Sequence, residues 1–312
     1  MTAARAAIDI GSNSLRLLVA EPDDGPTPWK ALAKELRITR LAQDLRQTGR
    51  LHPVAIGRTV AALDEFLHII WRHGLSASST YAVATAAVRE ANNRDEFLSQ
   101  VASATGLNVH VIDGRQEATM SLAGASKALD YRHGLNMLLF DIGGGSTEFV
   151  RAENRRLTDA TSRKLGVVSL TESHLASDPP SSADYTAMID ETMKHLETVQ
   201  AQWGKTKAPA TLVGTAGTVT TLAALHLGMA HYDAERIDNL VISIDEFVAL
   251  KQRLLCMTYD ERASLPLVGI GRADLMVAGI AIVEAVMRQW HYRELVTVDA
   301  GLLEGAWLAG AT

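Results

Sequence analysis

The sequence predicts a two-lobed α/β protein. A short apolar strand ending in Asp-Ile-Gly opens the chain at Asp9–Gly11 and returns at Asp141–Gly143. After each copy, strand signals alternate with helix-length segments, which favours α/β layers over an all-α or all-β fold. The 312 residues also exceed what one hydrophobic core usually serves. We therefore predict two related lobes, residues 1–128 and 129–312, with the last helix free to pack back on the first lobe.

The first lobe is predicted to open with a β-hairpin. Ala6–Ile10 and Leu15–Ala20 are apolar and flank residues typical of a turn. Pro53 then suits a first helical position, and apolar residues recur at helical spacing over Val54–Trp71. The remaining elements are a strand at Thr80–Ala84, a helix at Arg94–Thr105, a strand at Val109–Ile112 and a helix after Gly114.

The second lobe is predicted to open in the same way, with strands at Met137–Ile142 and Glu148–Arg151 around a glycine-rich turn. Ser243 and Glu246 form a capping box for a helix that ends near Met257. The other predicted elements are a joint at Ser177–Ser182, a helix through Trp203, a strand at Ala210–Val213, a helix at Val219–Leu227, a helix at Arg272–Trp290, a strand at Leu295–Val298 and a helix at Gly301–Leu308.

Composition excludes several classes of function. The net charge is −6 with no long run of one sign, so we expect no nucleic-acid partner, which would need a concentrated basic surface. Cys256 is the single cysteine, which fits a reducing compartment. We see neither a signal-peptide core nor an apolar stretch of membrane-spanning length. A cytoplasmic protein without a membrane partner is therefore expected.

The two hairpin loops are the leading candidates for substrate binding. Consecutive glycines are unfavourable for packing, but they let a ligand approach the backbone, and successive N–H groups form a nest for phosphate. A purely structural turn is the alternative for each loop taken alone. The residues proposed to bind substrate are Gly11, Ser12, Asn13 and Ser14 in the first loop and Gly143, Gly144, Gly145, Ser146 and Thr147 in the second.

A third glycine-rich segment, Gly214–Thr218, leads from a strand into a helix. Free N–H groups at a helix N-terminus bind anions, so Gly214, Gly217 and Thr218 are further substrate-binding candidates. The segment lacks the Gly-Lys-Ser/Thr of a P-loop and is not GxGxxG. A tight structural turn explains it equally well.

Carboxylates and an arginine surround these loops. Asp9, Asp141 and Glu148 flank the hairpin loops, where their oxygens suit Mg²⁺ (or Mn²⁺) beside phosphate. Glu117 stands at a predicted helix start, as either a simple first-turn carboxylate or a general base. Arg89 is placed to hold phosphate. Weaker candidates for the same task are Arg16, Arg37, Arg40, Arg115, Arg163 and Lys164.

Together these motifs identify a resemblance. The chain resembles the exopolyphosphatase/guanosine pentaphosphate phosphohydrolase family of the sugar kinase/chaperone/actin superfamily. The matching segments are AIDIGSNSLRLLV, ITRLAQDL, TAAVREANN, GRQEA, FDIGGGSTEFV, LGVVSLTE, GTAGTVTTLAAL, GRADLMVAGIAIV and DAGLLEGA. They follow the family order and cover nearly the whole chain.

The resemblance implies two ribonuclease-H-like lobes with the active site in the cleft between them. It implies that Glu117 activates the attacking water and that Glu148 and Asp141, with Asp9 close by, hold the essential Mg²⁺. Arg89 would add positive charge, and a homodimer is implied as well. The expected activity is release of orthophosphate from the end of polyphosphate, with Glu117 and Glu148 as catalytic residues.

Three alternatives stay open at this point. Hydrolysis of the 5′ γ-phosphate of guanosine pentaphosphate would use the same residues, and no guanine pocket is recognisable in the sequence. A kinase of the superfamily would need an adenosine site and a phosphoryl acceptor. A non-catalytic polyphosphate or nucleotide sensor would not need Glu117, Glu148 and Asp141, all of which are present.

Overall fold

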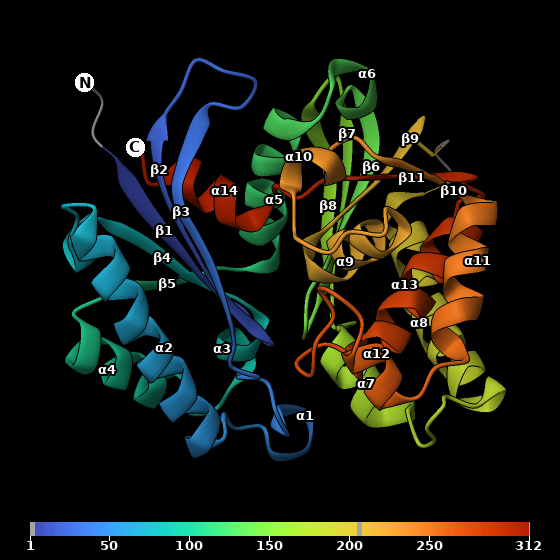
Figure 1. The fold of residues 1–312 in the computed structure, drawn as a ribbon, viewed down its shortest axis with the longest axis horizontal. Helices are drawn as coiled ribbons and strands as arrows, with labels where there is room; N and C mark the ends of the chain where they lie inside the picture. The colour runs from blue at the N-terminus through green and yellow to red at the C-terminus, as the bar shows by residue number, and fades with distance from the viewer. Residues whose placement is uncertain (1–3, 205–207, 312) are drawn as a thin grey trace. The chain divides into compact units, whose positions relative to one another are not determined.

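The computed structural model describes residues 4–204 and 208–311 and divides into two compact units. Unit 1 contains the chain up to Ala128 and the segment from Ala300 onward, and unit 2 spans Leu129–Asp299. Each unit is built around one sheet with helices packed against it (Figure 1).

The sheet of unit 1 has the order β3-β2-β1-β4-β5. β1 runs antiparallel to β2, and β2 antiparallel to β3, whereas β4 and β5 continue the sheet in parallel. The strands are β1 (Arg5–Ile10), β2 (Ser14–Pro22), β3 (Trp29–Ile38), β4 (Thr80–Ala84) and β5 (Val109–Val111).

Helices cover the unit 1 sheet on both faces (Figure 1). α2 (Pro53–Arg72) and α4 (Arg94–Thr105) pack against the face that carries Ile8 and Ile10. α14 (Leu302–Ala309) packs against the opposite face, and α5 (Gly114–Ala128) packs against α14. Shorter helices are α1 (Leu45–Thr48), η1 (Ala77–Ser79) and α3 (Ala86–Glu90).

Two glycines allow α5 and α14 to touch backbone to backbone. A Cβ on Gly305 would lie 1.9 Å from the Met120 carbonyl oxygen, and a Cβ on Gly124 would lie 2.1 Å from that of Gly301. Any side chain at either position would force the helices apart. This close approach attaches the C-terminal helix to the helix that carries Glu117.

The sheet of unit 2 has the order β10-β11-β9-β6-β7-β8. β6, β7 and β8 are antiparallel neighbours, β9 and β11 continue from β6 in parallel, and β10 is an antiparallel edge. The strands are β6 (Asn136–Ile142), β7 (Thr147–Glu153), β8 (Arg156–Arg163), β9 (Thr211–Thr215), β10 (Val241–Ser243) and β11 (Glu294–Thr297).

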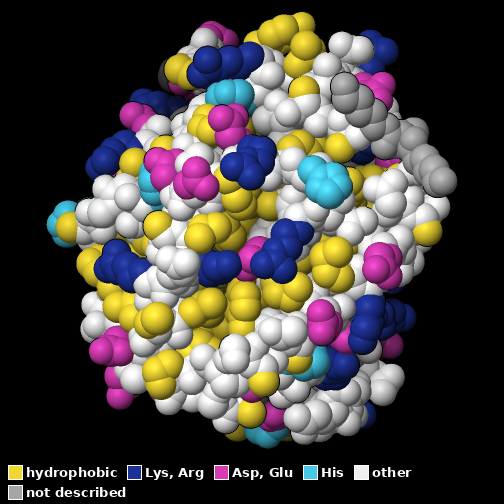
Figure 2. Space-filling view, turned by 90° about the vertical axis from the view of Figure 1, so that its right-hand side faces the viewer, with side chains coloured by type: hydrophobic (Ala, Val, Ile, Leu, Met, Phe, Trp, Pro, Cys, Tyr) yellow, Lys and Arg dark blue, Asp and Glu magenta, His cyan; other side chains and the backbone are white. Residues whose placement is uncertain are grey.

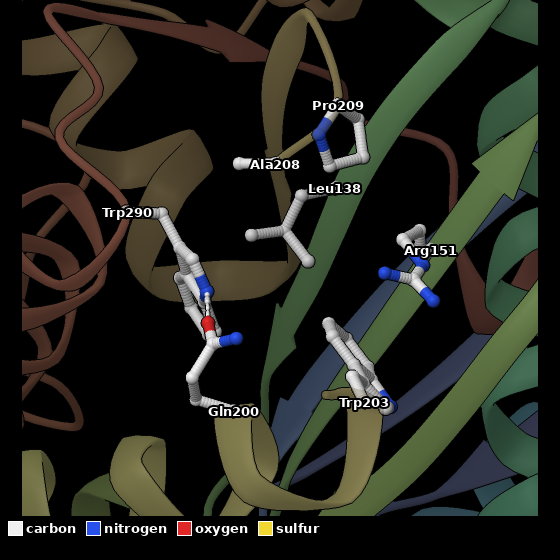
Figure 3. A pocket seen from close by; sticks show the side chains of 7 residues that line it. All are labelled: Leu138, Arg151, Gln200, Trp203, Ala208, Pro209 and Trp290. Atoms are coloured by element: carbon white, nitrogen blue, oxygen red, sulfur yellow. Dashed lines mark hydrogen bonds between the residues drawn. The ribbon is translucent and has the colours of Figure 1, made fainter. Parts of the chain in front are cut away.

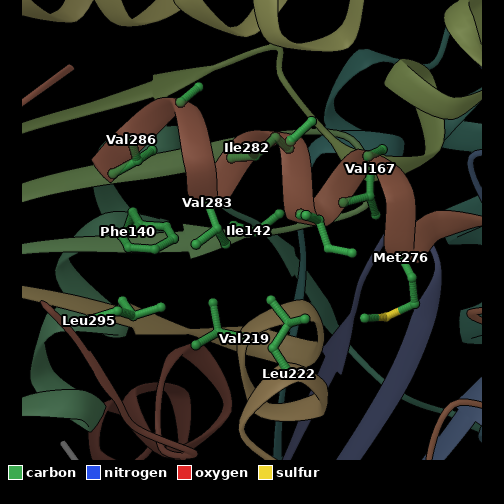
Figure 4. Close-up of a cluster of buried hydrophobic side chains, with 14 of the residues drawn as sticks. Phe140, Ile142, Val167, Val219, Leu222, Met276, Ile282, Val283, Val286 and Leu295 are labelled. Carbon is green, nitrogen blue, oxygen red and sulfur yellow. The ribbon is translucent and has the colours of Figure 1, made fainter. Parts of the chain in front are cut away.

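The main core of unit 2 lies on the sheet face that carries Phe140 and Ile142. Figure 4 shows α13 (Leu275–Gln289) crossing this face with Ile282, Val283 and Val286 turned into the cluster. The other helices of the unit are α6 (Tyr131–Gly134), α7 (Val167–His174), α8 (Ser182–Trp203), α9 (Ala216–His226), α10 (Ala234–Ile237), α11 (Ile244–Leu255) and α12 (Tyr259–Ala263).

The two sheets confirm the prediction of two related α/β lobes. Each has three antiparallel strands followed by two parallel ones, so that β1 corresponds to β6 and β2 to β7. The Ser243–Glu246 capping box is also confirmed. Edge strands β3 and β8 were not predicted, and the helix expected from Arg272 begins at Leu275. Within the described residues, no helix is both long and apolar enough to cross a membrane.

Candidate functional site

The two hairpin loops share one backbone design. The Gly11 N–H donates to the Ser14 carbonyl at 3.0 Å, and the Gly143 N–H donates to the Ser146 carbonyl at 2.8 Å. A Cβ on either glycine would lie within 2.9 Å of that carbonyl oxygen, so only glycine permits the turn. Gly11 and Gly143 therefore close their loops and use their own N–H groups in doing so.

The first loop is braced from one side. The Ser12 carbonyl accepts the Ala42 N–H at 2.8 Å, and the Asn13 carbonyl accepts the Arg40 N–H at 2.9 Å. In a trans peptide the N–H points opposite to the C=O of the same unit. The N–H groups of Asn13 and Ser14 therefore point away from the bracing segment, which is the orientation an anion nest requires.

The second loop is braced in the same way by the start of α7. The Gly143 and Gly144 carbonyls accept the Val167 and Val168 N–H groups at 3.1 and 2.9 Å. The N–H groups of Gly144 and Gly145 belong to the same peptide units, so they point away from α7. The first N–H groups of α7 are thus occupied by hydrogen bonds to the loop. The N–H groups of Gly144 and Gly145 are the donors that the loop offers to an anion.

The hydroxyl groups of the second loop are deeply placed. Ser146 is 3% exposed, and Thr147 is fully buried with its hydroxyl donating to the Leu165 carbonyl. Next to Leu165, a Cβ on Gly166 would lie 2.1 Å from the Gly144 carbonyl oxygen. Thr147 and Gly166 therefore shape the loop, and Gly166 is a residue that the sequence analysis did not single out.

A row of polar side chains crosses the unit 2 sheet beside this loop. Asp141 lies directly opposite Glu148 on β7, and both are more than nine-tenths buried. Thr215 neighbours Asp141 on β9, and Ser162 on β8 donates its hydroxyl to Glu148 Oε1 at 2.7 Å. Directly opposed side chains share a face of the sheet and lie close together. The row therefore concentrates two like charges in a buried place.

A divalent cation fits this acidic pair. Two opposed carboxylates repel one another unless a cation lies beside them, and Mg²⁺ is typically held by one or two carboxylates together with substrate phosphates and water. Within residues 4–204 and 208–311, no group of three or more His, Cys, Asp or Glu side chains could hold a metal. Of the predicted metal ligands, Asp141 and Glu148 are the two that adjacent strands of unit 2 bring together.

The equivalent position of unit 1 carries an ion pair instead. Asp9 lies opposite Arg16, whose Nε and Nη2 donate to Asp9 Oδ2 at 3.0 and 2.8 Å. Asp9 Oδ1 and Asn13 Oδ1 are buried atoms that accept no hydrogen bond from the described residues. Arg16 thus compensates the charge of Asp9, while one of its oxygens remains available to a ligand.

Glu117 is held at the start of α5. It is 6% exposed, and its Oε2 accepts a hydrogen bond from Arg89 Nη1 at 3.0 Å. The same nitrogen donates to the Ile112 carbonyl at 2.9 Å, which fixes Arg89 against the end of the sheet. Asp113 caps the helix by accepting the N–H groups of Arg115 and Gln116. The structure therefore brings together the predicted base and the predicted phosphate-binding arginine.

The third glycine segment is closely packed and lies beside an arginine. A Cβ on Gly214 would lie 2.9 Å from Phe140, so this glycine is needed for packing. Gly217 faces the Arg272 guanidinium, since a Cβ there would lie 3.4 Å from Nη2. Arg272 also donates to the Thr221 hydroxyl at 3.1 Å. Thr218 contacts α13, where a Cβ on Gly279 would overlap its methyl group.

The pocket between two tryptophans is a poor second candidate. It is lined by Leu138, Arg151, Gln200, Trp203, Ala208, Pro209 and Trp290 (Figure 3). Its cavity volume of about 10 Å³ is far below the roughly 300–1,000 Å³ typical of ligand sites. Its one charged side chain, Arg151, is already paired with Asp159. The pocket therefore offers no group for catalysis.

The face of the molecule in Figure 2 has a mixed charge. Lys and Arg side chains lie among Asp, Glu and apolar side chains, and no continuous basic surface is seen among the described residues drawn there.

Comparisons with known proteins give matches over nearly the whole chain. Residues 18–310 match the model of the Ppx/GppA phosphatase family. Exopolyphosphatase 2 of Mycobacterium tuberculosis is 35% identical, with 97% of each chain covered. The crystal structure of an exopolyphosphatase-like protein superposes with a TM-score of 0.90 at 30% identity and covers 98% of this chain and 97% of its own. The Aquifex aeolicus member of the Ppx/GppA family gives 0.81 at 30% identity, over 99% of this chain and 97% of its own.

Proposed function

Because this chain belongs to the Ppx/GppA phosphatase family, we propose that it is an exopolyphosphatase that releases orthophosphate from the end of inorganic polyphosphate. The observation that carries the proposal is the buried Glu117 carboxylate, which α5 and Arg89 hold in place. A protein that only bound polyphosphate would not need this carboxylate. The M. tuberculosis relative named an exopolyphosphatase supports the same substrate class.

The proposed reaction is in-line attack of water on the terminal phosphorus. A bond forms between the water oxygen and phosphorus, the bridging P–O bond breaks, and the shortened polyphosphate leaves with the bridging oxygen. Glu117 accepts a proton from the attacking water, and Arg89 both orients this carboxylate and adds positive charge. The N–H groups of Asn13, Ser14, Gly144 and Gly145 bind nonreacting phosphate oxygens.

Asp141 and Glu148 would hold a divalent cation, which we propose to be Mg²⁺ (or Mn²⁺). When bound, the cation neutralises phosphate oxygens and stabilises the charge that develops on them. Ser162 fixes the orientation of Glu148 through its hydrogen bond. We further propose that the protein is cytoplasmic and that it forms a homodimer. Light scattering after size-exclusion chromatography would test the homodimer.

Phosphate release by wild type and Glu117→Gln tests the function. The substrates are long polyphosphate, short polyphosphate, guanosine pentaphosphate and ATP in separate reactions with Mg²⁺. We expect release from polyphosphate and a decrease in kcat of about 10²- to 10⁴-fold in the variant, because general base catalysis is lost. Glu197→Gln on the exposed side of α8 is the matched control. Preferred hydrolysis of guanosine pentaphosphate would replace the proposed substrate, and an unchanged kcat would remove Glu117 from the mechanism.

A further inference from the structure

Arg272 reaches the third glycine segment from a stretch of chain without regular secondary structure. Residues 264–274 connect α12 to α13, and Arg272 projects from them toward Gly217 and Thr221 at the first turns of α9. The internal bonds of this connection are turn bonds, such as Val268 N–H to the Leu265 carbonyl at 3.3 Å and Arg272 N–H to the Gly269 carbonyl at 3.2 Å. Neither a helix nor a sheet therefore sets its position.

The connection is also exposed and locally unfavourable. Ile270 is 75% exposed, and Leu267 adopts a positive φ of 66°. A nonglycine residue in this conformation is less stable than in the right-handed region. Such a segment would sample several conformations unless other side chains fixed it.

Two side chains of α12 supply that fixation. Arg262 is 1% exposed, and its Nε donates to the Ala273 carbonyl at 3.0 Å, directly beside Arg272. The hydroxyl of Tyr259 donates to the Ile270 carbonyl at 3.0 Å. The two bonds hold the connection on either side of residues 271 and 272.

The same side chains are anchored to a third segment. Arg262 also donates to the Met257 carbonyl and, at 3.4 Å, to Asp178 Oδ1. Asp178 in turn accepts the Tyr259 N–H at 2.7 Å. The planar guanidinium therefore links the segment before α8, the start of α12 and the end of the 264–274 connection.

Burying this guanidinium is costly. Burial lowers the pKa of Arg262, although the nearby Asp178 carboxylate opposes the effect. An apolar side chain of similar volume would often be at least as stabilising at such a position. What an apolar side chain cannot provide is a rigid set of donors aimed at three fixed acceptors. The arginine is thus better explained by the geometry that it imposes than by stability.

We propose that Arg262 and Tyr259 are positioning residues that hold Arg272 against the N-terminal turn of α9, where Arg272 binds an oxyanion of the substrate. This inference rests on the proposed phosphohydrolase function. Arg262 and Tyr259 contact no reacting group and act through the carbonyls of Ala273 and Ile270.

Tyr259→Phe is the sharpest test because it removes one hydroxyl. Tyr292→Phe is its matched control, since the Tyr292 hydroxyl donates to the Pro209 carbonyl at 2.8 Å in the same unit and not to a carbonyl of the 264–274 connection. The loss of one hydrogen bond corresponds to about a 2- to 10-fold change in an equilibrium constant. We expect Tyr259→Phe to raise the KM for polyphosphate by that factor with kcat little changed, and Tyr292→Phe to leave the KM unchanged.

A double variant and hydrogen exchange complete the experiment. If Tyr259 acts through Arg272, Tyr259→Phe should add nothing to the KM of Arg272→Gln. Amide exchange within residues 264–274 should accelerate in Tyr259→Phe and Arg262→Lys but not in Tyr292→Phe. Equal KM values for the two phenylalanine variants, additive effects in the double variant or unchanged exchange would each overturn the proposal. If wild type releases no phosphate, the proposed function fails, while the exchange measurement still decides the positioning role.

Discussion

Replacing Ser162 by alanine should weaken metal binding more than it slows the reaction at saturating metal. The hydroxyl lies 2.7 Å from Glu148 Oε1 on the neighbouring strand, and Glu148 is 1% exposed. A hydrogen bond to a charged group contributes about 1.5–3 kcal/mol. At about 1.4 kcal/mol for each factor of ten, its loss corresponds to a roughly 10- to 100-fold weaker site. This agrees with the effect of removing groups that orient metal ligands elsewhere.

The assay is phosphate release from polyphosphate as a function of Mg²⁺ concentration, together with direct Mn²⁺ binding measured by electron paramagnetic resonance. Ser162→Ala should shift both midpoints upward by the same factor. Ser173→Ala is the control, because its hydroxyl donates to the Ser169 carbonyl at 2.8 Å within α7. An unchanged Mn²⁺ affinity in Ser162→Ala would refute the assignment of Glu148 as a metal ligand.

Three further predictions concern the loops and the core. Gly166→Ala should abolish activity and lower the free energy of unfolding by about 1–3 kcal/mol, because the new Cβ would overlap the Gly144 carbonyl. A normal KM in this variant would contradict the role of Gly166 in shaping the loop. Burial opposes ionisation of Glu284, but hydrogen bonds such as that from Tyr185 outweigh it and lower the pKa of the carboxyl. The resulting stability is present above the unfolded pKa near 4.5 and is lost as pH falls through the folded pKa. Glu284→Gln should therefore destabilise by about 3 kcal/mol at neutral pH, less at acid pH, and parallel curves of melting temperature against pH would refute this. Ala216 has a φ of 69°, so Ala216→Gly should keep or raise stability by up to about 1 kcal/mol in urea unfolding, whereas a valine there should lower it.

Sequence patterns predicted the elements whose signals are local. Both hairpin loops, the helix beginning at Pro53 and the Ser243 cap depend on neighbouring residues, and all are present in the structure. The edge strands β3 and β8 were missed because charged and polar residues occupy both of their faces. Charged edge strands resist pairing with other chains. Because apolar and polar residues do not alternate regularly along them, the sequence carries no clear strand signal there.

The parts of the candidate site that the sequence did not predict depend on contacts between distant segments. Ser162 reaches Glu148 because of the register between β7 and β8, and nothing in β8 itself indicates that register. Arg272 was assigned to a helix, although it lies before α13 and faces Gly217 instead. Its place depends on the bond from Arg262 to Ala273, which no spacing rule predicts.

The internal repeat accounts for how one backbone design can serve two chemical tasks. Both hairpins have an aspartate at the same place before the loop, and the strand partner decides what that aspartate does. Arg16 lies opposite Asp9 and neutralises its negative charge. Glu148 lies opposite Asp141 and adds a second negative charge. The divalent cation that we propose is therefore assigned to the second arrangement. Exchanging the partners tests this reasoning directly: Glu148→Arg should abolish Mn²⁺ binding in unit 2 while the hairpin, closed by its own backbone bond, still folds.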